Sequence, residues 1–158
     1  MRNEKNIDAT QDDEEEQIEL VDFTGEMRLA YTKQRIRQNF FRRSVLSNYG
    51  GRCCISGVSD KRFLVASHIV AWMDDKSDRL NPSNGLCLSS IHDKAFDSHL
   101  FSLSDDFRII LPEELRNTKG KFLQDIFLRL DGFQISLPDK FTPGQAFIRE
   151  AEHSAFFL

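Results

Sequence analysis

The stretch FLVASHIVAWMDDKSDRLNPSNGLCLSSIHDKAFDSHL, from Phe63 to Leu100, decides the fold. It places three histidines, an asparagine before a glycine and several aspartates around two short apolar runs. A hydrophobic core does not call for such residues, because a buried polar group must find a partner. Either His68, Asn84 and His92 are scattered surface residues, or they form one chemical site.

The same stretch predicts two strands and a helix. Residues 63–72 are rich in β-forming residues and residues 85–90 form a second short apolar run, so both are predicted strands separated by a polar loop. Residues 90–101 carry apolar side chains at helical spacing, with Ser89 or Ser90 as the N-cap. Two antiparallel strands with this helix packed across them would bring the polar residues together.

The flanking sequence extends this unit to an α+β fold class, a small mixed domain with flanking helices. A helix is predicted from Arg28 to Tyr49, because glycine and proline are absent there and Gly50-Gly51 ends it. The downstream pattern predicts, in order, a pair of short strands within 99–111, a helical region at 113–130, a strand at 132–138 and a helix at 143–156.

The net charge of −4 hides two segments of opposite sign. Residues 1–26 hold ten acids and two bases, so residues 1–25 are predicted to form an acidic, disordered arm, and residues 26–158 one domain. Residues 28–62 hold nine bases and one acid, which suits either a solvated helix face or a surface that binds phosphates. The candidates for nucleic-acid binding are Arg35, Arg37, Arg42, Arg43 and Arg52.

The cysteines and the hydropathy bear on location. Three cysteines, two of them adjacent, argue against a disulfide framework and for the reducing cytoplasm. Cys54 and Cys87 are expected to be small buried residues, because the sequence lacks the paired Cys-x-x-Cys knuckles of a zinc site. Neither a signal peptide nor an apolar run long enough to cross a bilayer is expected, so no membrane partner is either.

The polar residues of the opening stretch suit hydrolysis of a phosphodiester. A neutral imidazole at His68 can take a proton from water, and the amide of Asn84 can hold a backbone group or an imidazole. A histidine or aspartate at positions 92–93 can bind a divalent cation, which would stabilise charge on the phosphate and on the leaving oxygen.

Four pieces of this sequence, taken in order, resemble the HNH nuclease family, whose core is the ββα-metal finger. They are CISG at 54–57, ASHI at 66–69, NGLCL at 84–88 and HDKAFD at 92–97. The resemblance covers roughly residues 38–112 and implies a ββα-metal core at about 62–100. It depends on all four pieces together, because NG alone is a common turn.

The resemblance assigns a role to each residue of the motif. His68 matches the general base that activates water. Asn84 matches the asparagine that braces the loop and the base histidine. His92 matches the last histidine, where the family places a metal ligand, and these three are the predicted catalytic residues.

The sequence departs from the family at two positions. Ser67 stands where many members have a ligand aspartate, and Asp93 stands at the spacing where many have the last histidine. Adjacent helix residues point about 100° apart, so one of His92 and Asp93 is expected to face the metal. Spacing favours Asp93 and residue type favours His92, which is preferred here. Asp97 is a further candidate ligand, and His99, where members often carry glycine, is expected to follow the helix.

The function implied by the resemblance is a metal-dependent DNA endonuclease, of the restriction or host-defence kind. Mg²⁺ is the implied ion, with Mn²⁺ or Zn²⁺ as alternatives. Target choice would come from a homodimer, a specificity domain or a partner. Two other classes stay open: a catalytically inactive nucleic-acid-binding module, which Ser67 makes conceivable, and an interaction protein that acts through its acidic arm.

Overall fold

The computed structural model describes residues 25–70 and 78–155. The predicted acidic arm lies outside these residues except for Gly25. The helices are α2 (Gly25–Asn48), α3 (Ser90–Asp97), α4 (Glu113–Arg116), α5 (Lys121–Phe127) and α6 (Gln145–Ala155), with 3-10 turns η1 (Pro82–Asn84) and η2 (Leu128–Leu130). The strands are β1 (Leu64–His68), β2 (Gly85–Ser89), β3 (Ser102–Leu103) and β4 (Ile109–Ile110). The chain divides into two compact units, Met1–Arg37 and Gln38–Leu158, and α2 runs through the boundary.

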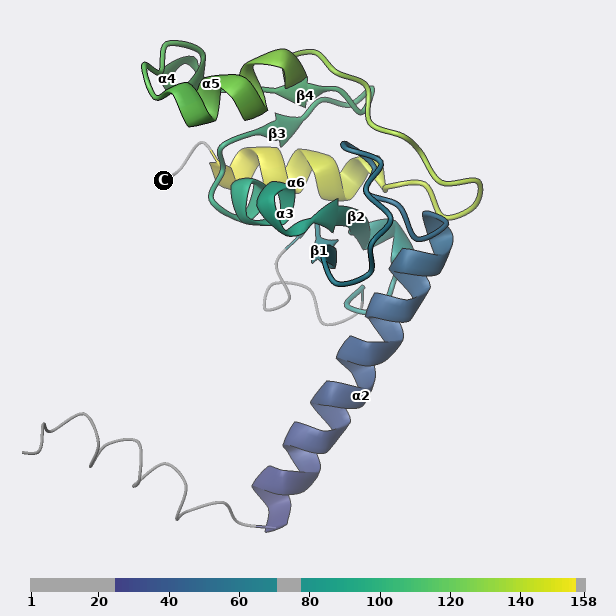
Figure 1. Cartoon of the computed structure of the whole chain (residues 1–158). Helices are drawn as coiled ribbons and strands as arrows, with labels where there is room; N and C mark the ends of the chain where they lie inside the picture. The colour runs from purple at the N-terminus through teal and green to yellow at the C-terminus, as the bar shows by residue number, and fades with distance from the viewer. Residues whose placement is uncertain (1–24, 71–77, 156–158) are drawn as a thin grey trace, which may run out of the picture. The chain divides into compact units, whose positions relative to one another are not determined.

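The second unit contains the predicted strand–strand–helix arrangement. β1 and β2 pair antiparallel, with Leu64 opposite Ser89 at one end of the ladder and His68 opposite Gly85 at the other. α3 follows β2 directly and packs against both strands (Figure 1). This mixture of helices and small antiparallel sheets confirms the predicted α+β class.

Gly85 allows the second half of α2 to approach β2 closely. A Cβ atom at Gly85 would lie 2.4 Å from Cγ2 of Val45 and 3.0 Å from Cζ of Phe41. The φ of Gly85 is −133°, which is ordinary extended backbone. The glycine of the Asn84-Gly85 pair is therefore required by helix–strand packing and not by a hairpin turn.

The C-terminal part follows the prediction with two differences. The strand pair is present as β3 and β4, and α6 matches the predicted last helix, but the predicted helix at 113–130 is broken by residues 117–120. The strand predicted at 132–138 is wrong. Backbone groups of this segment bond to Ile109 and Phe107, on either side of the isolated bridge between Arg108 and Gln134, and then to Cys54, so the pairing is too short to form a strand.

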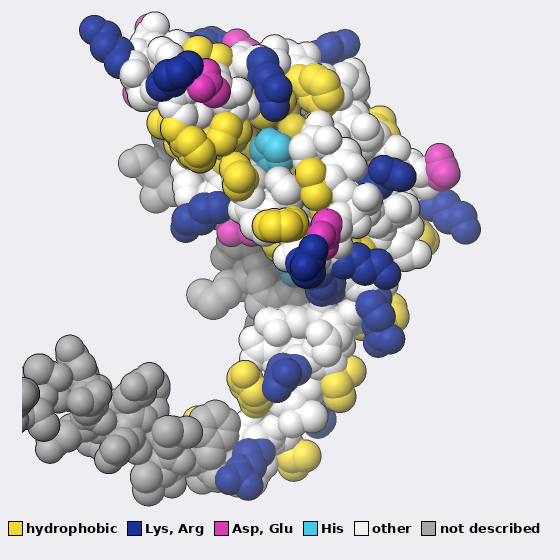
Figure 2. All heavy atoms as spheres, viewed as in Figure 1, with side chains coloured by type: hydrophobic (Ala, Val, Ile, Leu, Met, Phe, Trp, Pro, Cys, Tyr) yellow, Lys and Arg dark blue, Asp and Glu magenta, His cyan; other side chains and the backbone are white. Residues whose placement is uncertain are grey.

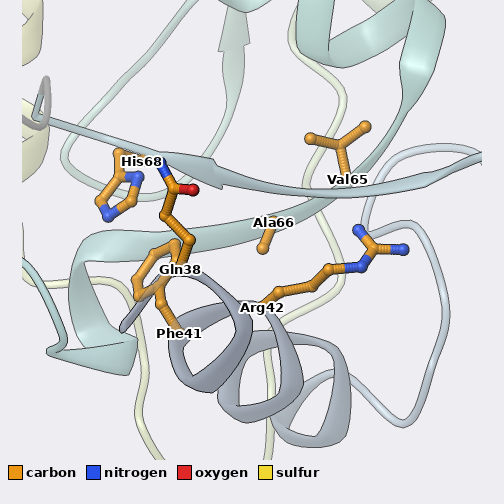
Figure 3. Close-up of a pocket in the computed structure, with 6 residues that line it drawn as sticks. All are labelled: Gln38, Phe41, Arg42, Val65, Ala66 and His68. Atoms are coloured by element: carbon orange, nitrogen blue, oxygen red, sulfur yellow. The ribbon is translucent and has the colours of Figure 1, made fainter. Parts of the chain in front are cut away.

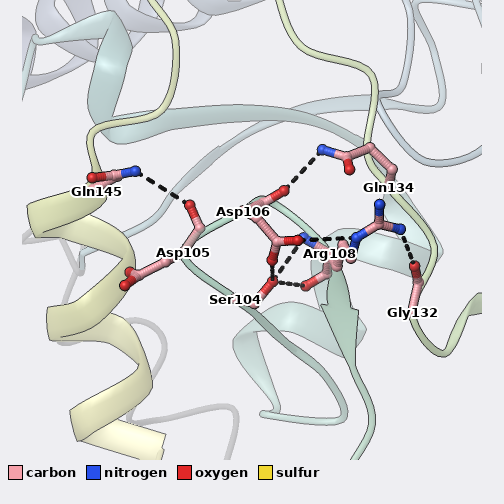
Figure 4. A network of polar contacts seen from close by, with 7 residues as sticks. All are labelled: Ser104, Asp105, Asp106, Arg108, Gly132, Gln134 and Gln145. Atoms are coloured by element: carbon pink, nitrogen blue, oxygen red, sulfur yellow. Dashed lines mark hydrogen bonds and ion pairs between the residues drawn. The ribbon is translucent and has the colours of Figure 1, made fainter.

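Polar contacts hold the turn between β3 and β4 (Figure 4). Arg108 bonds the Asp106 carboxylate and the carbonyl oxygen of Gly132, both at 3.0 Å. Gln134 donates to the carbonyl oxygen of Asp106 at 2.8 Å, and Ser104 donates to the Asp106 side chain. These contacts fasten the turn to the segment that follows η2.

One hydrophobic core runs under the ββα unit and the C-terminal helices. Its fully buried members include Leu86, Leu88 and Phe101. All three cysteines are free thiols buried in this core, as expected for Cys54 and Cys87. Among the described residues, no helix combines the length and apolar character that crossing a bilayer requires.

Candidate active site

His68 ends β1 and is held on two sides. Its ring stacks on the ring of Phe41 from α2, with centroids 3.8 Å apart and planes inclined by 8°. Its Nε2 lies 3.1 Å from the carbonyl oxygen of Arg79. A carbonyl oxygen only accepts, so Nε2 carries the proton, and in the neutral ring Nδ1 carries the lone pair. Burial lowers the pKa of His68 more than the Arg79 carbonyl and the Asp97 charge raise it, which favours the neutral ring.

Asn84 is buried and braces the chain that follows His68. Its Oδ1 accepts from the backbone N–H of Val70 at 2.9 Å, and its Nδ2 donates to the carbonyl oxygen of Val70 at 3.4 Å. The carbonyl oxygen of Asn84 also accepts from the N–H of Ile69 at 3.0 Å. Both ends of the side-chain amide thus fix the backbone of Val70, two residues after the histidine, and the backbone carbonyl of Asn84 fixes Ile69.

Two aspartates of α3 share a neighbourhood with His68 and Ser67. Burial raises the pKa of Asp93, the nearby Ser67 hydroxyl lowers it and the Asp97 charge raises it, with a net upward shift. The charge of Asp97 also acts on His68. Ser67 is 3% exposed, and its hydroxyl makes no hydrogen bond of 3.5 Å or less within the described residues. The buried Ser67 hydroxyl thus lies close enough to the partly buried Asp93 carboxylate to act on its pKa.

His92 is buried, and its contacts are with core residues and with Ser89. It is 7% exposed, and its Nδ1 lies 2.9 Å from Oγ of Ser89 and 3.7 Å from Sγ of Cys53. Its ring meets the edge of the Phe127 ring at 6.2 Å and 84°. Burial raises the pKa of Cys53, but its hydrogen bonds with His92 and Ser56 outweigh burial and lower this pKa to about 6. The structure therefore brings Asp93, and not the imidazole of His92, beside Ser67.

A pocket of about 300 Å³ opens beside His68 (Figure 3). Its lining comes from α2 and β1: Gln38, Phe41, Arg42, Val65, Ala66 and His68. The half-buried histidine forms part of the wall, so a molecule in this pocket would contact the ring directly. The pocket is therefore an opening beside the His68 ring.

The predicted nucleic-acid-binding arginines have different surroundings. Arg42 donates to the carbonyl oxygens of Leu64 at 2.7 Å and Lys61 at 3.3 Å, so its guanidinium braces the start of β1. The other four predicted arginines are exposed, and none forms an ion pair with an acid in the described part of the chain. Figure 2 shows Lys and Arg side chains along α2. In contrast, exposed arginines such as Arg108 and Arg149 are paired with Asp106 and Asp105.

Residues 53–104 match the sequence model of a family described as HNH endonuclease. The chain carries an HNH domain. The match contains the whole ββα unit, and the site residues that lie outside it are those on α2, Arg52 and Phe127. No curated protein is similar enough to the sequence to serve as a relative.

HNH nucleases typically use a divalent metal ion, and the residues of this HNH domain fit one of the hard cations. Within the described residues, no three His, Cys, Asp or Glu side chains gather as a ligand cluster. Mg²⁺ does not need such a cluster, because it keeps several waters and binds one or two carboxylates with substrate phosphates. Asp93 and Asp97 lie one helical turn apart on α3, and they are the carboxylates that could hold such an ion, with the buried Ser67 hydroxyl near Asp93. The donor set suits Zn²⁺ less, since Zn²⁺ favours nitrogen and sulfur ligands.

Sequence reasoning missed three contacts of this HNH domain. The stacking of Phe41 on His68 joins residues of separate elements, and the bond from His68 to Arg79 crosses a loop. The approach of Cys53 to His92 spans 39 positions. Phe41 and Cys53 look like ordinary core residues in the sequence, so no local pattern could have found their role.

Proposed function

We propose that the protein is a metal-dependent DNA endonuclease that hydrolyses phosphodiester bonds. An HNH domain indicates nuclease activity in general. The observation that supports the specific proposal is the state of His68, a neutral imidazole whose Nε2 proton is committed to Arg79 while two aspartates lie close by. This is the arrangement that a general base beside a cation site requires.

The reaction begins with His68. Nδ1 takes a proton from a water molecule, and the resulting hydroxide attacks phosphorus while the bond to the 3′ oxygen breaks. A divalent ion held by Asp93, with Asp97 and a water on Ser67, would stabilise the negative charge on the phosphate and on the leaving oxygen. In this proposal Asp93 replaces His92, which the sequence favoured as ligand, because Asp93 is the residue near Ser67.

Two further residues keep the base in position. Asn84 fixes the backbone at Ile69 and Val70, which limits movement of the strand end that carries His68. Phe41 holds the ring plane by stacking on it. Both act through His68, and neither needs to contact DNA.

We assign the binding of DNA to the exposed lysine and arginine side chains of α2 and to Arg52. Arginines without an acidic partner can neutralise phosphates, a contact that positions a protein without reading sequence. Target choice would then come from a second copy, a further domain or a partner, as in restriction and defence systems. The three buried free thiols support action in a reducing compartment such as the cytoplasm.

The test is cleavage of supercoiled plasmid in Mg²⁺ or Mn²⁺ by the wild type, by His68→Ala and by His153→Ala. His153 is an exposed histidine of α6 and serves as the control. We expect metal-dependent nicking by the wild type and by His153→Ala, and none by His68→Ala. DNA binding without any nicking would instead favour the inactive binding module. Nicking that survives in purified His68→Ala would refute the role of His68.

A further inference from the structure

We infer that His92 is a positioning residue, which holds the first turn of α3 so that Asp93 faces Ser67, and that it is not a metal ligand. The inference rests on the proposed function, because it concerns how the proposed ion site is built. It gives the imidazole inside the HDKAFD motif a role that its residue type alone would not suggest.

The hydroxyl of Ser89, at the cap of α3, contacts the ring of His92. Ser89 is the N-cap of α3, a position where serine normally accepts a hydrogen bond from a backbone N–H of the first turn. Its side chain makes no such bond and lies instead 2.9 Å from Nδ1 of His92, the third residue of the helix. The cap hydroxyl therefore fixes a side chain of the first turn, and with it the rotation of the helix start.

Ser89 and Ser67 lie far apart along the ladder of β1 and β2. Ser89 pairs with Leu64, whereas Ser67 pairs with Leu86, three residues away along β2. At about 3.3 Å per residue, the two serines lie on rungs roughly 10 Å apart. Ligands of one ion lie within about 5 Å of one another, because each is about 2.0–2.6 Å from the metal. An imidazole anchored at the Ser89 rung is poorly placed to share an ion with Ser67.

The ring of His92 is buried on the side of α3 that faces the core. The ring of His92 is 7% exposed and lies between Sγ of Cys53 and the edge of Phe127. These contacts tie α3 to the turn before β1 and to α5. With one helix residue fixed in the core, the next is rotated by about 100°, and Asp93 is the residue that this rotation brings toward β1.

The experiment measures Mn²⁺ binding by electron paramagnetic resonance, with thermal unfolding and plasmid nicking of the same samples. The variants are His92→Asn, His92→Leu, Ser89→Ala and Asp93→Asn, with Ile91→Ala as control, since Ile91 is an exposed neighbour in the same turn. Asparagine can place an amide nitrogen near the position of Nδ1, so His92→Asn keeps the bond to Ser89. His92→Leu and Ser89→Ala remove it.

We expect His92→Leu and Ser89→Ala to weaken Mn²⁺ binding by about tenfold, the usual effect of losing a residue that orients a ligand. His92→Asn should stay within about threefold of the wild type, and Asp93→Asn should lose binding. Nitrogen couplings of the bound Mn²⁺ should be the same in the wild type and in His92→Asn. Loss of a directly bound nitrogen in His92→Asn would make His92 a ligand and overturn the inference.

Two other outcomes would also overturn it. The first is an unchanged Mn²⁺ affinity in both His92→Leu and Ser89→Ala, whatever their melting temperatures. It would show that the contact between Ser89 and His92 does not orient Asp93. The second is failure of the wild type to bind Mn²⁺, which would refute the proposed metal site itself. It differs from the first outcome because it is measured on the protein without any substitution.

Discussion

Nε2 of His68 lies 3.1 Å from the carbonyl oxygen of Arg79, and this contact decides which nitrogen of the ring can act as a base. The carbonyl oxygen accepts a hydrogen bond from Nε2–H, so the lone pair of the neutral ring is on Nδ1. The strand end, the loop residue and the stacking ring of Phe41 together determine the orientation of that lone pair. A substitution can therefore separate the anchoring nitrogen from the basic one.

His68→Gln makes this separation. The glutamine amide can still donate a hydrogen bond toward the Arg79 carbonyl, but it has no lone pair that takes a proton at neutral pH. We expect nicking to fall by about 10²–10⁴-fold, the usual contribution of a general base, with a melting temperature close to that of the wild type. The measurement is the single-turnover nicking rate beside a thermal melt. A rate within tenfold of the wild type would place the base elsewhere.

Gly85→Ala should disturb the site from behind. The added Cβ would lie 2.4 Å from Val45 and 3.0 Å from Phe41, and Phe41 stacks on His68. We expect a loss of about 1–3 kcal/mol in the free energy of unfolding, typical of overpacking, together with slower nicking. Urea denaturation measures the first effect and plasmid cleavage the second.

The control for this substitution is Gly25→Ala. Gly25 begins α2, and an added Cβ would meet no heavy atom within 4 Å. Its nicking rate should match that of the wild type, and its stability should be equal or slightly higher, because alanine has less freedom than glycine in the unfolded chain. Equal stability of Gly85→Ala and the wild type would mean that α2 does not pack on β2 as described.

The sequence predicted the ββα unit because its signals are local. β-forming runs at residues 63–72 and 85–90 and the helical spacing after Ser89 each lie within one element, and each element formed within a few residues of its expected bounds. The segment 132–138 had the same kind of signal and failed. Its backbone hydrogen bonds go to Ile109, Phe107 and Cys54, and tertiary packing determines which partners these groups find.

The sequence predicted which residues are candidates for the site but not how their side chains are oriented. Motif spacing identified Ser67, His68, Asn84 and the pair at 92–93, and the structure brings Ser67, His68 and Asp93 into one neighbourhood. Which residue of the pair faces Ser67 depends on the rotation of α3. Contacts of His92 with Cys53 and Phe127 set that rotation, and both partners are distant in sequence.

His99→Gly should stabilise the protein without changing cleavage. His99 follows α3 with a φ of 54°, and the N–H groups of His99 and Leu100 bond to the carbonyl oxygens of Phe96 and Ala95, a Schellman ending. Glycine adopts this left-handed backbone without strain, at the cost of more freedom in the unfolded chain. We expect a net gain of about 0.5–1 kcal/mol in urea denaturation.

Ser98→Gly is the matched control for this substitution. Ser98 precedes His99 with a φ of −92°, where glycine brings no relief of strain, so this variant should be less stable than the wild type. A stability of His99→Gly below that of the wild type would mean that the imidazole makes a stabilising contact that outweighs the backbone strain.

Removing single exposed arginines should weaken DNA binding in a salt-dependent way. Arg35, Arg37, Arg43 and Arg52 have no acidic partner within the described residues, so each can release counterions on meeting a phosphate. Where the wild-type arginine contacts a phosphate, its replacement by glutamine should reduce the slope of log affinity against log salt by about 1. This reduction should be the same for DNA of unrelated sequence. Arg149→Gln is the control, because Arg149 is already paired with Asp105 at 2.9 Å and should leave the slope almost unchanged. Equal slopes in all five variants and the wild type would exclude α2 and Arg52 from the DNA interface.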